Sequence, residues 1–593
     1  MKKTSYLLKT LCISLLSAVA LSLAAQEEQS EAALNRELTL EREYNPSVQD
    51  ANKVNTLPAV KEPQITKMPI DYAVLSLPAE PKREIDLLPA AHILSDMSYN
   101  KRRGYANLGA GSYLNVNGDA GYQLLRTEKD QLNLFLSHRS TQGNLEYIGG
   151  FKKGDQVKAK VNDNLGGLNY RHELERSALR LGAKYGYSAF NYYGMPAPNA
   201  YSSWPGPVAD VLTNQLSRQI TAHAGLESKD IKPVGYLFEL DYTNFSYKYA
   251  WDESMAGITE HTLGARMGLY ATLGADQRIG VAAKVNYFFY NLPDSTASTF
   301  QNYMETTLTP YFKAEGDFWN LKLGANLMFI SGMNGNKMQL FVSPNAGFEI
   351  NPGAKTVLYL NAGGEIHSNS AFQLSRENRY IDPYISVTPS RTWLDATAGV
   401  KSGILPGFWF NIFGGYKATS DDYFFIPYMT PEGFGNLSRV LPSDSRLLRL
   451  GVELRYAYRK LFELSLKGVY NQWDEEKDEL DDRIATADFQ WAPKRKAYGR
   501  PVMEWTAGAN VRPLEKLSLA FDYYLASGRK MLLYGYNEDM KDINELNFTA
   551  SYTFNDTFGA YLKAKNLLNK QYELIYGYPL QGFSIMGGVN INF

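Results

Sequence analysis

Histidine is the side chain best suited to bind a metal ion or transfer a proton near neutral pH, and this chain of 593 residues has six. They are scattered singly, as His92, His138, His172, His223, His261 and His367. None pairs with another at metal-ligand spacing, and neither Gly-x-Ser-x-Gly nor His-Glu-x-x-His occurs. We therefore expect no enzyme, no catalytic residue, no metal site and no cofactor; a catalytic site assembled from distant loops is the alternative.

The densest run of charge is DEEKDELDD, Asp474 to Asp482. Calcium loops place carboxylates at alternate positions and follow them with glycine, and this run lacks that pattern. Lys494 to Lys496 nearly offset its charge. We interpret the run as a solvated loop, and divalent bridging to lipopolysaccharide is the alternative.

The elements that must position these residues are strands. The last eleven residues, FSIMGGVNINF, place apolar or small side chains at every odd position from Phe583 to Phe593, and a period of two predicts a strand. The runs from Leu448 to Tyr458 and from Leu546 to Phe554 alternate in the same way. Strands of ten or more residues with aromatic ends fit a bilayer better than a soluble sandwich.

The first residues direct the chain across a membrane. Three lysines precede an apolar run from Leu11 to Leu23, and Ala24 and Ala25 follow, which predicts a signal peptide over residues 1–25. The only cysteine, Cys12, lies in that run, so we expect no disulfide in the mature chain. No later apolar run reaches the ~20 residues of a membrane helix. Strands that cross a membrane must close into a barrel, because an open sheet edge cannot be left in hydrocarbon.

Residues 26–103 differ from the rest because seven prolines interrupt them. Each proline removes a backbone donor and disfavours helix at the residue before it. We interpret this segment as an extended periplasmic arm. Two roles stay open for it: a solvated linker, or a segment that lies along a partner or enters the barrel.

Residues 104–593 alternate short and long connections between strands, which is typical of barrels with short periplasmic turns and longer outer loops. The predicted turns are 127–130, 175–178, 229–235, 274–277, 315–318, 351–355, 405–408, 459–461, 512–516 and 555–558. The predicted long connections are 140–162, 190–215, 248–257, 292–301, 368–386, 426–445, 474–501, 528–541 and 570–582, with two short outer ones after Asn115 and after Gly332. The count gives an all-β fold: a transmembrane antiparallel β-barrel of about 22 strands in a Gram-negative bacterial outer membrane.

The end of the chain, AKNLLNKQYELIYGYPLQGFSIMGGVNINF, resembles the end of a TonB-dependent receptor barrel. The matching elements are Asn-Leu-Leu-Asn-Lys with Tyr572, Gly577 to Pro579, and a last strand that ends on Phe593. The opening strand from Gly104 also resembles the first barrel strand of that family. The resemblance implies that Phe593 belongs to an assembly signal that the barrel-assembly machinery recognises.

One part of the family pattern is missing. TonB-dependent receptors carry a globular plug of about 120 to 150 residues before the barrel, whereas the proline-broken segment 26–103 is too short for one. We therefore expect a barrel without a plug. Energised uptake driven by TonB is not implied.

Aromatic and charged residues indicate possible contacts. The loop from Asn191 to Pro207 holds Tyr192, Tyr193, Tyr201 and Trp204 on a proline-stiffened backbone, a surface that suits sugars or protein partners; a structural loop folded over the barrel mouth would use the same residues. We assign the aromatic run Tyr423 to Phe425, at a strand end, to an interfacial girdle. Six charged residues fall at lumen positions and either set selectivity or pair across strands: Arg449, Glu453, Arg455, Asp522, Lys563 and Lys565.

Two functions follow as hypotheses. The first is a porin-like conduit, passive or gated by a partner, for solute transport across the outer membrane. The second is a structural or assembly subunit of an outer-membrane complex that uses residues 26–103 to contact a periplasmic or outer-membrane protein. Outer-membrane lipid and lipopolysaccharide surround either one. The near-neutral charge of -1 gives no reason to expect nucleic acid.

Overall fold

The structure is a computed structural model of the chain, and it describes residues 102–150, 152–195, 213–229, 233–250, 255–274, 276–292, 300–333, 338–353, 355–403, 405–427, 437–474, 496–533 and 536–593. The predicted signal peptide and nearly all of the predicted arm lie outside these residues, as do Tyr201 and Trp204.

The first half of the chain forms long strands that each pair with the next. They are β1 (Gly104–Gly111), β2 (Asn115–Arg126), β3 (Asp130–Glu146), β4 (Gln156–Glu173), β5 (Ser177–Asn191), β6 (Asn214–Ser228), β7 (Val234–Tyr247), β8 (Thr259–Leu273), β9 (Gln277–Asn291), β10 (Tyr303–Gly316), β11 (Trp319–Ser331), β12 (Gln339–Pro344) and β13 (Ala346–Gly353). A 3-10 turn, η1 (Ser112–Leu114), joins the first two.

The second half continues the sheet and adds, among its described residues, one helix, α2 (Ala371–Glu377). Its strands are β14 (Thr356–Gly363), β15 (Ile366–His367), β16 (Ser390–Ser402), β17 (Phe408–Pro427), β18 (Ser438–Tyr458), β19 (Phe462–Asp474), β20 (Met503–Leu514), β21 (Leu517–Ser527), β22 (Lys530–Leu533), β23 (Tyr536–Asp539), β24 (Ile543–Thr553), β25 (Phe558–Lys565) and β26 (Ser584–Asn592). No helix among the described residues is long and apolar enough to cross a membrane.

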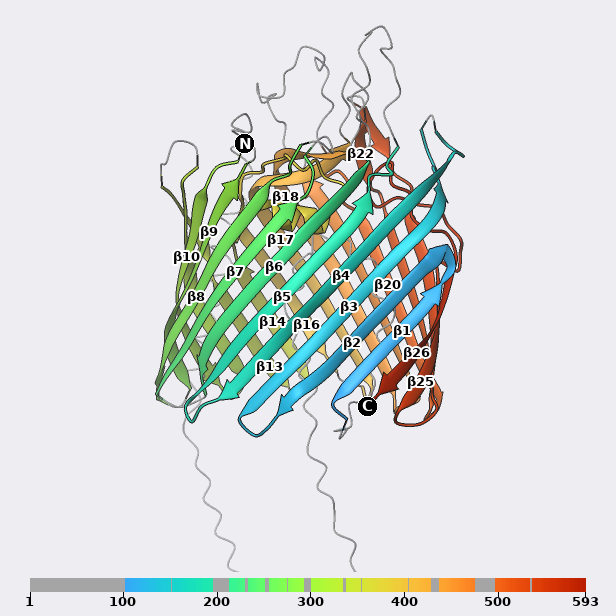
Figure 1. Cartoon of the computed structure of the whole chain (residues 1–593). Coiled ribbons are helices and arrows are strands. Elements are labelled where there is room, and N and C mark those ends of the chain that lie inside the picture. Colours follow the sequence, from blue (N-terminus) through green and yellow to red (C-terminus); the bar gives the residue numbers. More distant parts are fainter. Residues whose placement is uncertain are drawn as a thin grey trace, which may run out of the picture. The chain divides into compact units, whose positions relative to one another are not determined.

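The strands form one closed barrel (Figure 1). Within the described residues its sheet has 24 segments, but β12 and β13 both pair with β11, and β14 and β15 both pair with β16, so the wall has 22 strands. The ring closes where β1 pairs antiparallel with β26. Strands β22 and β23 form a separate hairpin. The predicted antiparallel barrel of 22 strands is confirmed.

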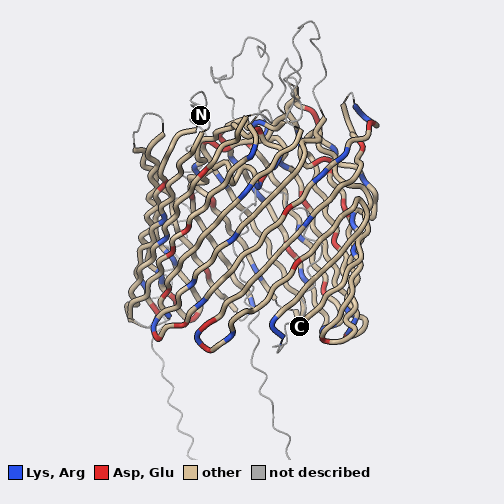
Figure 2. The backbone as a smooth tube through the Cα atoms, in the orientation of Figure 1, with Lys and Arg blue, Asp and Glu red and all other residues tan. Residues whose placement is uncertain are grey.

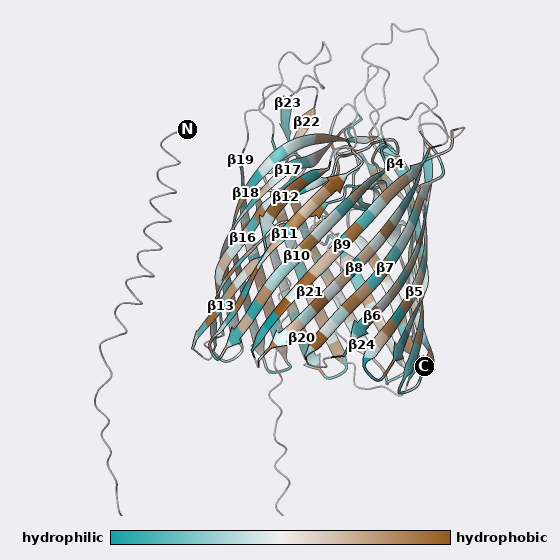
Figure 3. Ribbon diagram, turned by 90° about the vertical axis from the view of Figure 1, so that its left-hand side faces the viewer, coloured by the Kyte–Doolittle hydropathy of each residue, from teal (hydrophilic) through white to brown (hydrophobic). Residues whose placement is uncertain are grey.

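The alternation in the sequence matches the two faces of the wall. In β26 the apolar side chains of Ile585 and Val589 are 43% and 45% exposed, facing outward. In β24 the polar residues Asn547 and Thr549 are 3% and 2% exposed, facing inward. Hydrophobic and hydrophilic residues alternate along the strands (Figure 3). A closed antiparallel barrel with an apolar outer face is the architecture of bacterial outer-membrane proteins, and the expected localisation is confirmed.

The ten predicted short turns all lie between consecutive strands at one end of the barrel, the end that the expected topology places in the periplasm. The predicted short connection after Asn115 lies slightly earlier, at Ser112–Leu114. Charges of both signs occur along the strands (Figure 2). Three predicted lumen residues form ion pairs with neighbours: Arg449 with Asp395, Glu453 with Lys467 and Arg455 with Glu463.

The wall is uneven in height. Strands β17 and β18 have 20 and 21 residues, whereas β25, β26 and β1 have 8, 9 and 8. Above the three short strands, on the outer side, loops take the place of the sheet (Figure 1). We call β17–β18 the tall wall and β25–β26–β1 the low wall.

Candidate functional site

The connection between β15 and β16 folds inward and crosses the outer mouth of the barrel; we call residues 368–389 the lid. Its two ends lie together, because His367 pairs with Ser390 and the Asn369 side-chain amide donates to Ser390 Oγ at 2.8 Å. Helix α2 begins after Ser370, whose hydroxyl caps it by accepting from Gln373 N.

Carboxylates of the wall hold the first part of the lid. Glu260 on β8 is 1% exposed and its Oε2 accepts from Ala371 N at 2.6 Å. Glu305 on β10 accepts from Ser368 Oγ at 2.8 Å. Tyr303 OH donates to Ser368 O at 2.7 Å. The side chains of β8 and β10 therefore anchor the entry to helix α2.

The second part of the lid reaches the far side of the barrel. The Arg379 guanidinium donates twice to the Asp163 carboxylate on β4, at 3.3 and 3.0 Å. Around the ring, β4 is ten strands from β16, where the lid ends, so these strands lie nearly opposite each other in the 22-strand wall. The lid thus spans the mouth.

Four tyrosines from three connections meet on the lid; we call Tyr192, Tyr193, Tyr380 and Tyr578 the tyrosine cluster. The rings of Tyr380 and Tyr578 stack with centroids 3.7 Å apart, and the Tyr193 ring meets that of Tyr578 edge-on at 5.0 Å. Tyr193 OH donates to Pro579 O at 3.2 Å. Burial raises the pKa of Tyr192, Tyr193 and Tyr578, so their phenols stay neutral and act through hydrogen bonds and packing.

The tall wall supports the lid from a third side. Tyr423 OH on β17 donates to Glu377 Oε2 at 2.7 Å, and Ile381 forms a parallel bridge with Ser438 on β18. Leu374, Ile381 and Tyr423 pack as a buried cluster. The girdle assignment of Tyr423 to Phe425 is wrong for Tyr423 and Phe424, which are 1% and 4% exposed because the folded lid and neighbouring connections cover them.

The predicted contact loop is only partly described. Tyr192 and Tyr193 are each 5% exposed and belong to the tyrosine cluster, where they pack against the lid and the last outer connection. Contact with a sugar or protein partner stays a prediction for this loop, and Tyr201 and Trp204 lie outside the described residues.

Phe593 lies at the seam of the barrel. Its ring is 54% exposed and stacks on Tyr122 at 6.0 Å, and its N–H donates to Gly104 O at 2.9 Å. This position gives no test of recognition during assembly, which stays a prediction.

The sequence did not reveal the lid, although it placed a long connection at 368–386. The available signal was local: AFQLSRE after Ser370 is a capped, helix-compatible stretch inside a loop, followed by the apolar and aromatic residues Tyr380, Ile381 and Tyr384. A solvated loop has no need of such residues.

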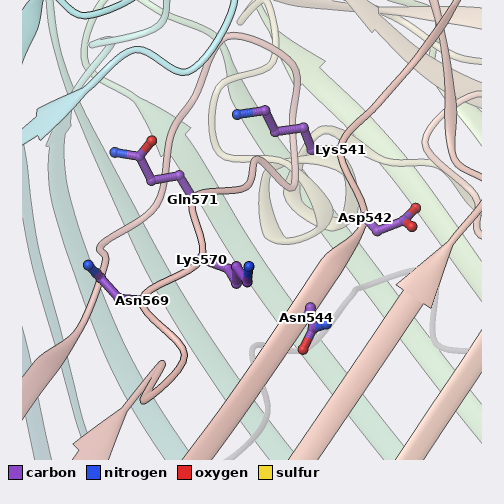
Figure 4. Close-up of a pocket in the computed structure, with 6 residues that line it drawn as sticks. All are labelled: Lys541, Asp542, Asn544, Asn569, Lys570 and Gln571. Atoms are coloured by element: carbon purple, nitrogen blue, oxygen red, sulfur yellow. The ribbon is translucent and has the colours of Figure 1, made fainter.

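A second site lies on the outside of the barrel (Figure 4). It is a cavity of about 430 Å³ at the outer end of β24, between the connections 528–542 and 566–583. Six polar residues line it: Lys541, Asp542, Asn544, Asn569, Lys570 and Gln571. Among the described residues, no group of three or more His, Cys, Asp or Glu side chains is arranged to hold a metal ion.

Comparison with known proteins shows which solved structures share the fold of this chain. No protein-family model and no curated protein matches the chain. The copper transporter OprC matches with a TM-score of 0.60 at 13% identity, over 83% of this chain and 80% of its own. The siderophore receptor PirA from Acinetobacter baumannii matches with a TM-score of 0.60 at 10% identity, over 83% and 81%. The ferric-catecholate import receptor Fiu from K12 E. coli matches with a TM-score of 0.57 at 12% identity, over 83% and 82%. At such identities the likeness concerns the fold, which is the barrel that the resemblance to TonB-dependent receptors implies.

Proposed function

We propose that the protein is a conduit for solutes across the outer membrane, passive or gated by a partner, whose outer mouth is closed by the lid. The observation that supports this proposal is the span of the lid, which is bonded to β4, β8, β10 and β17 around the mouth. A wall of 22 strands encloses a lumen wide enough to need closing. Because the lid is a single connection between two strands, it can move without a change in the strands of the wall.

The lumen suits polar solutes of either charge. Its charged residues form pairs of opposite sign, such as Arg449 with Asp395 and Lys467 with Glu453. Paired charges leave little net field along the pore, so we propose weak ion selectivity. We further propose that the barrel has no plug and that residues 26–103 form a second barrier at the periplasmic end.

Conductance in planar bilayers tests this proposal. The mature chain should conduct weakly. Deletion of residues 26–103 should raise the conductance, and replacement of the lid in that shortened chain by a short Gly-Ser turn, which the pairing of His367 with Ser390 permits, should raise it further. The resistances of two barriers in series add, so removal of one should raise the conductance and the double change should have the largest effect.

Replacement of the periplasmic turn 127–129 by Gly and Ser is the matched control, because this turn joins β2 and β3 at the end of the barrel opposite the lid. An unchanged trace after deletion of residues 26–103 would remove the arm as a gate. A double variant that still conducts no better than the mature chain would rule out the conduit.

The number of bonds that hold the lid in place favours a second candidate function, that of a structural or assembly subunit. Hydrogen bonds on three sides, such as the buried one of Glu260 to Ala371 and the part-buried one of Tyr423 to Glu377, would suit a barrel that stays shut. In this case residues 26–103 would contact the partner. Purification in mild detergent discriminates: a stoichiometric partner that is lost on deletion of residues 26–103 supports the subunit, and a monodisperse lone barrel argues against it.

A further inference from the structure

The cavity on the outside of the barrel lies where the low wall gives way to loops. Strand β25 ends at Lys565 and β24 begins at Ile543, and the cavity opens beside them at the outer rim. Asn544 lies on the outward face of β24, as its alternation with the inward Glu545 and Asn547 requires. The cavity therefore faces the surroundings of the barrel, and the lumen lies behind the wall (Figure 4).

The lining has two lysines and one carboxylate, so its net charge is positive. The ammonium groups of Lys541 and Lys570 are exposed and form no ion pair or hydrogen bond within the described residues. The one lining carboxylate, Asp542, accepts from Gly528 N at 3.3 Å through Oδ1. Two lysines that converge on one cavity suit an anion with several oxygens, such as a phosphate.

The lining also offers groups that bind hydroxyls. Asn544 Oδ1 is buried and has no hydrogen-bond partner in the structure, so a ligand that donates a hydrogen bond would satisfy it. Asn569 uses its Oδ1 to accept from Phe583 N at 2.9 Å, which leaves its amide N–H groups for a ligand acceptor. Phosphate oxygens for the lysines and sugar hydroxyls for Asn544 are present together in a phosphorylated sugar.

The neighbours of the cavity are apolar and point outward. Leu567 and Leu568, directly before the lining residues Asn569 to Gln571, are 38% and 41% exposed, and Phe583 is 43% exposed. Exposed leucines beside a polar cavity suit a ligand with acyl chains, whereas a soluble phosphosugar would leave them without a partner. The outer rim is also the depth at which lipid headgroups lie.

We propose that this cavity binds the phosphorylated sugar headgroup of a glycolipid of the outer leaflet, with Lys541 and Lys570 on phosphate, Asn544 on a sugar hydroxyl, and the acyl chains along Leu567 and Leu568. The inference does not depend on whether the barrel conducts solutes. It assigns the cavity a role in fixing the outer rim beside the low wall in the membrane, because the connection 566–583, which joins β25 to β26, supplies half of the lining.

Native mass spectrometry of the full chain in detergent tests this site, with diphosphorylated lipid A as the probe. The double variant Lys541→Gln with Lys570→Gln should bind lipid A about tenfold more weakly, because it loses two charge-assisted phosphate contacts. The matched control, Lys129→Gln with Lys355→Gln, changes two exposed lysines of periplasmic turns and should bind as the unchanged protein does. Asn544→Leu, which keeps the size of the side chain, should weaken binding several-fold.

Three further results decide between the sources of the phosphate. Dephosphorylated lipid A should bind the unchanged protein as weakly as lipid A binds the double variant. Glucosamine 6-phosphate that bound as tightly as lipid A would overturn the lipid assignment in favour of a soluble phosphosugar. Equal binding of lipid A by the double variant and by its control would overturn the site itself.

Discussion

The tall wall and the low wall satisfy the hydrogen-bonding groups of their backbone in different ways. Strands β17 and β18 span the membrane and continue past it as sheet, with 20 and 21 residues. Strands β25, β26 and β1 have 8, 9 and 8. In a sheet, each backbone N–H and C=O group bonds to the neighbouring strand. Where loops replace the sheet, individual side chains must supply those hydrogen bonds. Single substitutions should therefore matter more above the low wall.

Three side chains hold the connection 566–583 above the low wall and the neighbouring connection 528–542. Arg529 is 0% exposed and donates to the carbonyls of Lys541 and Leu574, at 2.6 and 3.5 Å. Tyr572 OH donates to Glu545 Oε2 on β24, and Asn566 Nδ2 donates to Lys570 O at 2.8 Å. The bonds of Arg529 to Leu574 and of Tyr572 to Glu545 join parts of the chain that no strand pairing connects.

The largest effect should come from Arg529→Met, which keeps the length of the side chain and removes its donors. Two part-buried carbonyls lose a charged donor, so the connections 528–542 and 566–583 should lose about 3 kcal/mol of local stability. Hydrogen exchange of residues 566–583 measures this loss. Arg455→Met on the tall wall is the control, because its pair with Glu463 is nearly half exposed and should contribute less than about 1 kcal/mol. Equal effects would contradict the contrast between the walls.

Tyr572→Phe should have a smaller effect of about 2 kcal/mol, because one hydroxyl that donates to a buried carboxylate is lost while the ring stays. Proteolysis within 566–583 should become several-fold faster. Tyr470→Phe on β19 removes a hydroxyl from a ring that is 40% exposed on the outer face and should leave the rate unchanged. A Tyr572→Phe variant as resistant as the unchanged protein would show that packing alone holds the connection.

Glu573 should make the same connection depend on pH, more weakly. Burial raises the pKa of this carboxyl from 4.5 to about 7, although Gly577 N–H, Arg529 and Lys541 act in the opposite direction. The folded connection keeps its proton between these pH values and the opened one does not, so stability is full below pH 4.5, falls as the pH rises to about 7 and is level above it.

Hydrogen exchange of residues 566–583, corrected for the intrinsic effect of pH, should follow this profile. Glu573→Gln keeps the shape without the titration and should abolish the dependence. Protection that increases between pH 5 and pH 7 in the unchanged protein would contradict the sign.

Phe593→Ala should have the smallest effect on the folded barrel. The ring stacks on Tyr122 and is 54% exposed to the surroundings of the barrel, so less than the roughly 1.5 to 3 kcal/mol of a fully buried side chain is lost. Heat-modifiable migration after refolding in detergent should be nearly unchanged. In cells the amount in the outer membrane should fall if Phe593 is the assembly signal, and a wild-type amount would make it an ordinary strand residue.

The wall could be predicted from the sequence because the patterns that determine it lie within each strand and turn. Alternation such as that of Ile585 and Val589 sets the face of each residue, and turn residues set each strand end. The lid could not be predicted, because Arg379 and Asp163 lie 216 residues apart and no local pattern connects them. For the same reason Tyr423 looked like a girdle residue. Its neighbours in the sequence suit an interface, and only the folded lid shows that it is covered.

The row of residues Tyr561, Gly588 and Gly109 lies across β25, β26 and β1. The Tyr561 ring lies over both glycines, and a side chain at either position would collide with it. This row joins the first and last strands of the barrel, next to the place where Ser112 and Ile585 meet although 473 positions separate them. Contacts of such separation are slow to form. The Tyr561 side chain reaches its place only when the first strand pairs with the last, so its packing marks closure of the barrel. The ultraviolet absorbance of Tyr561 therefore offers a way to follow closure in time.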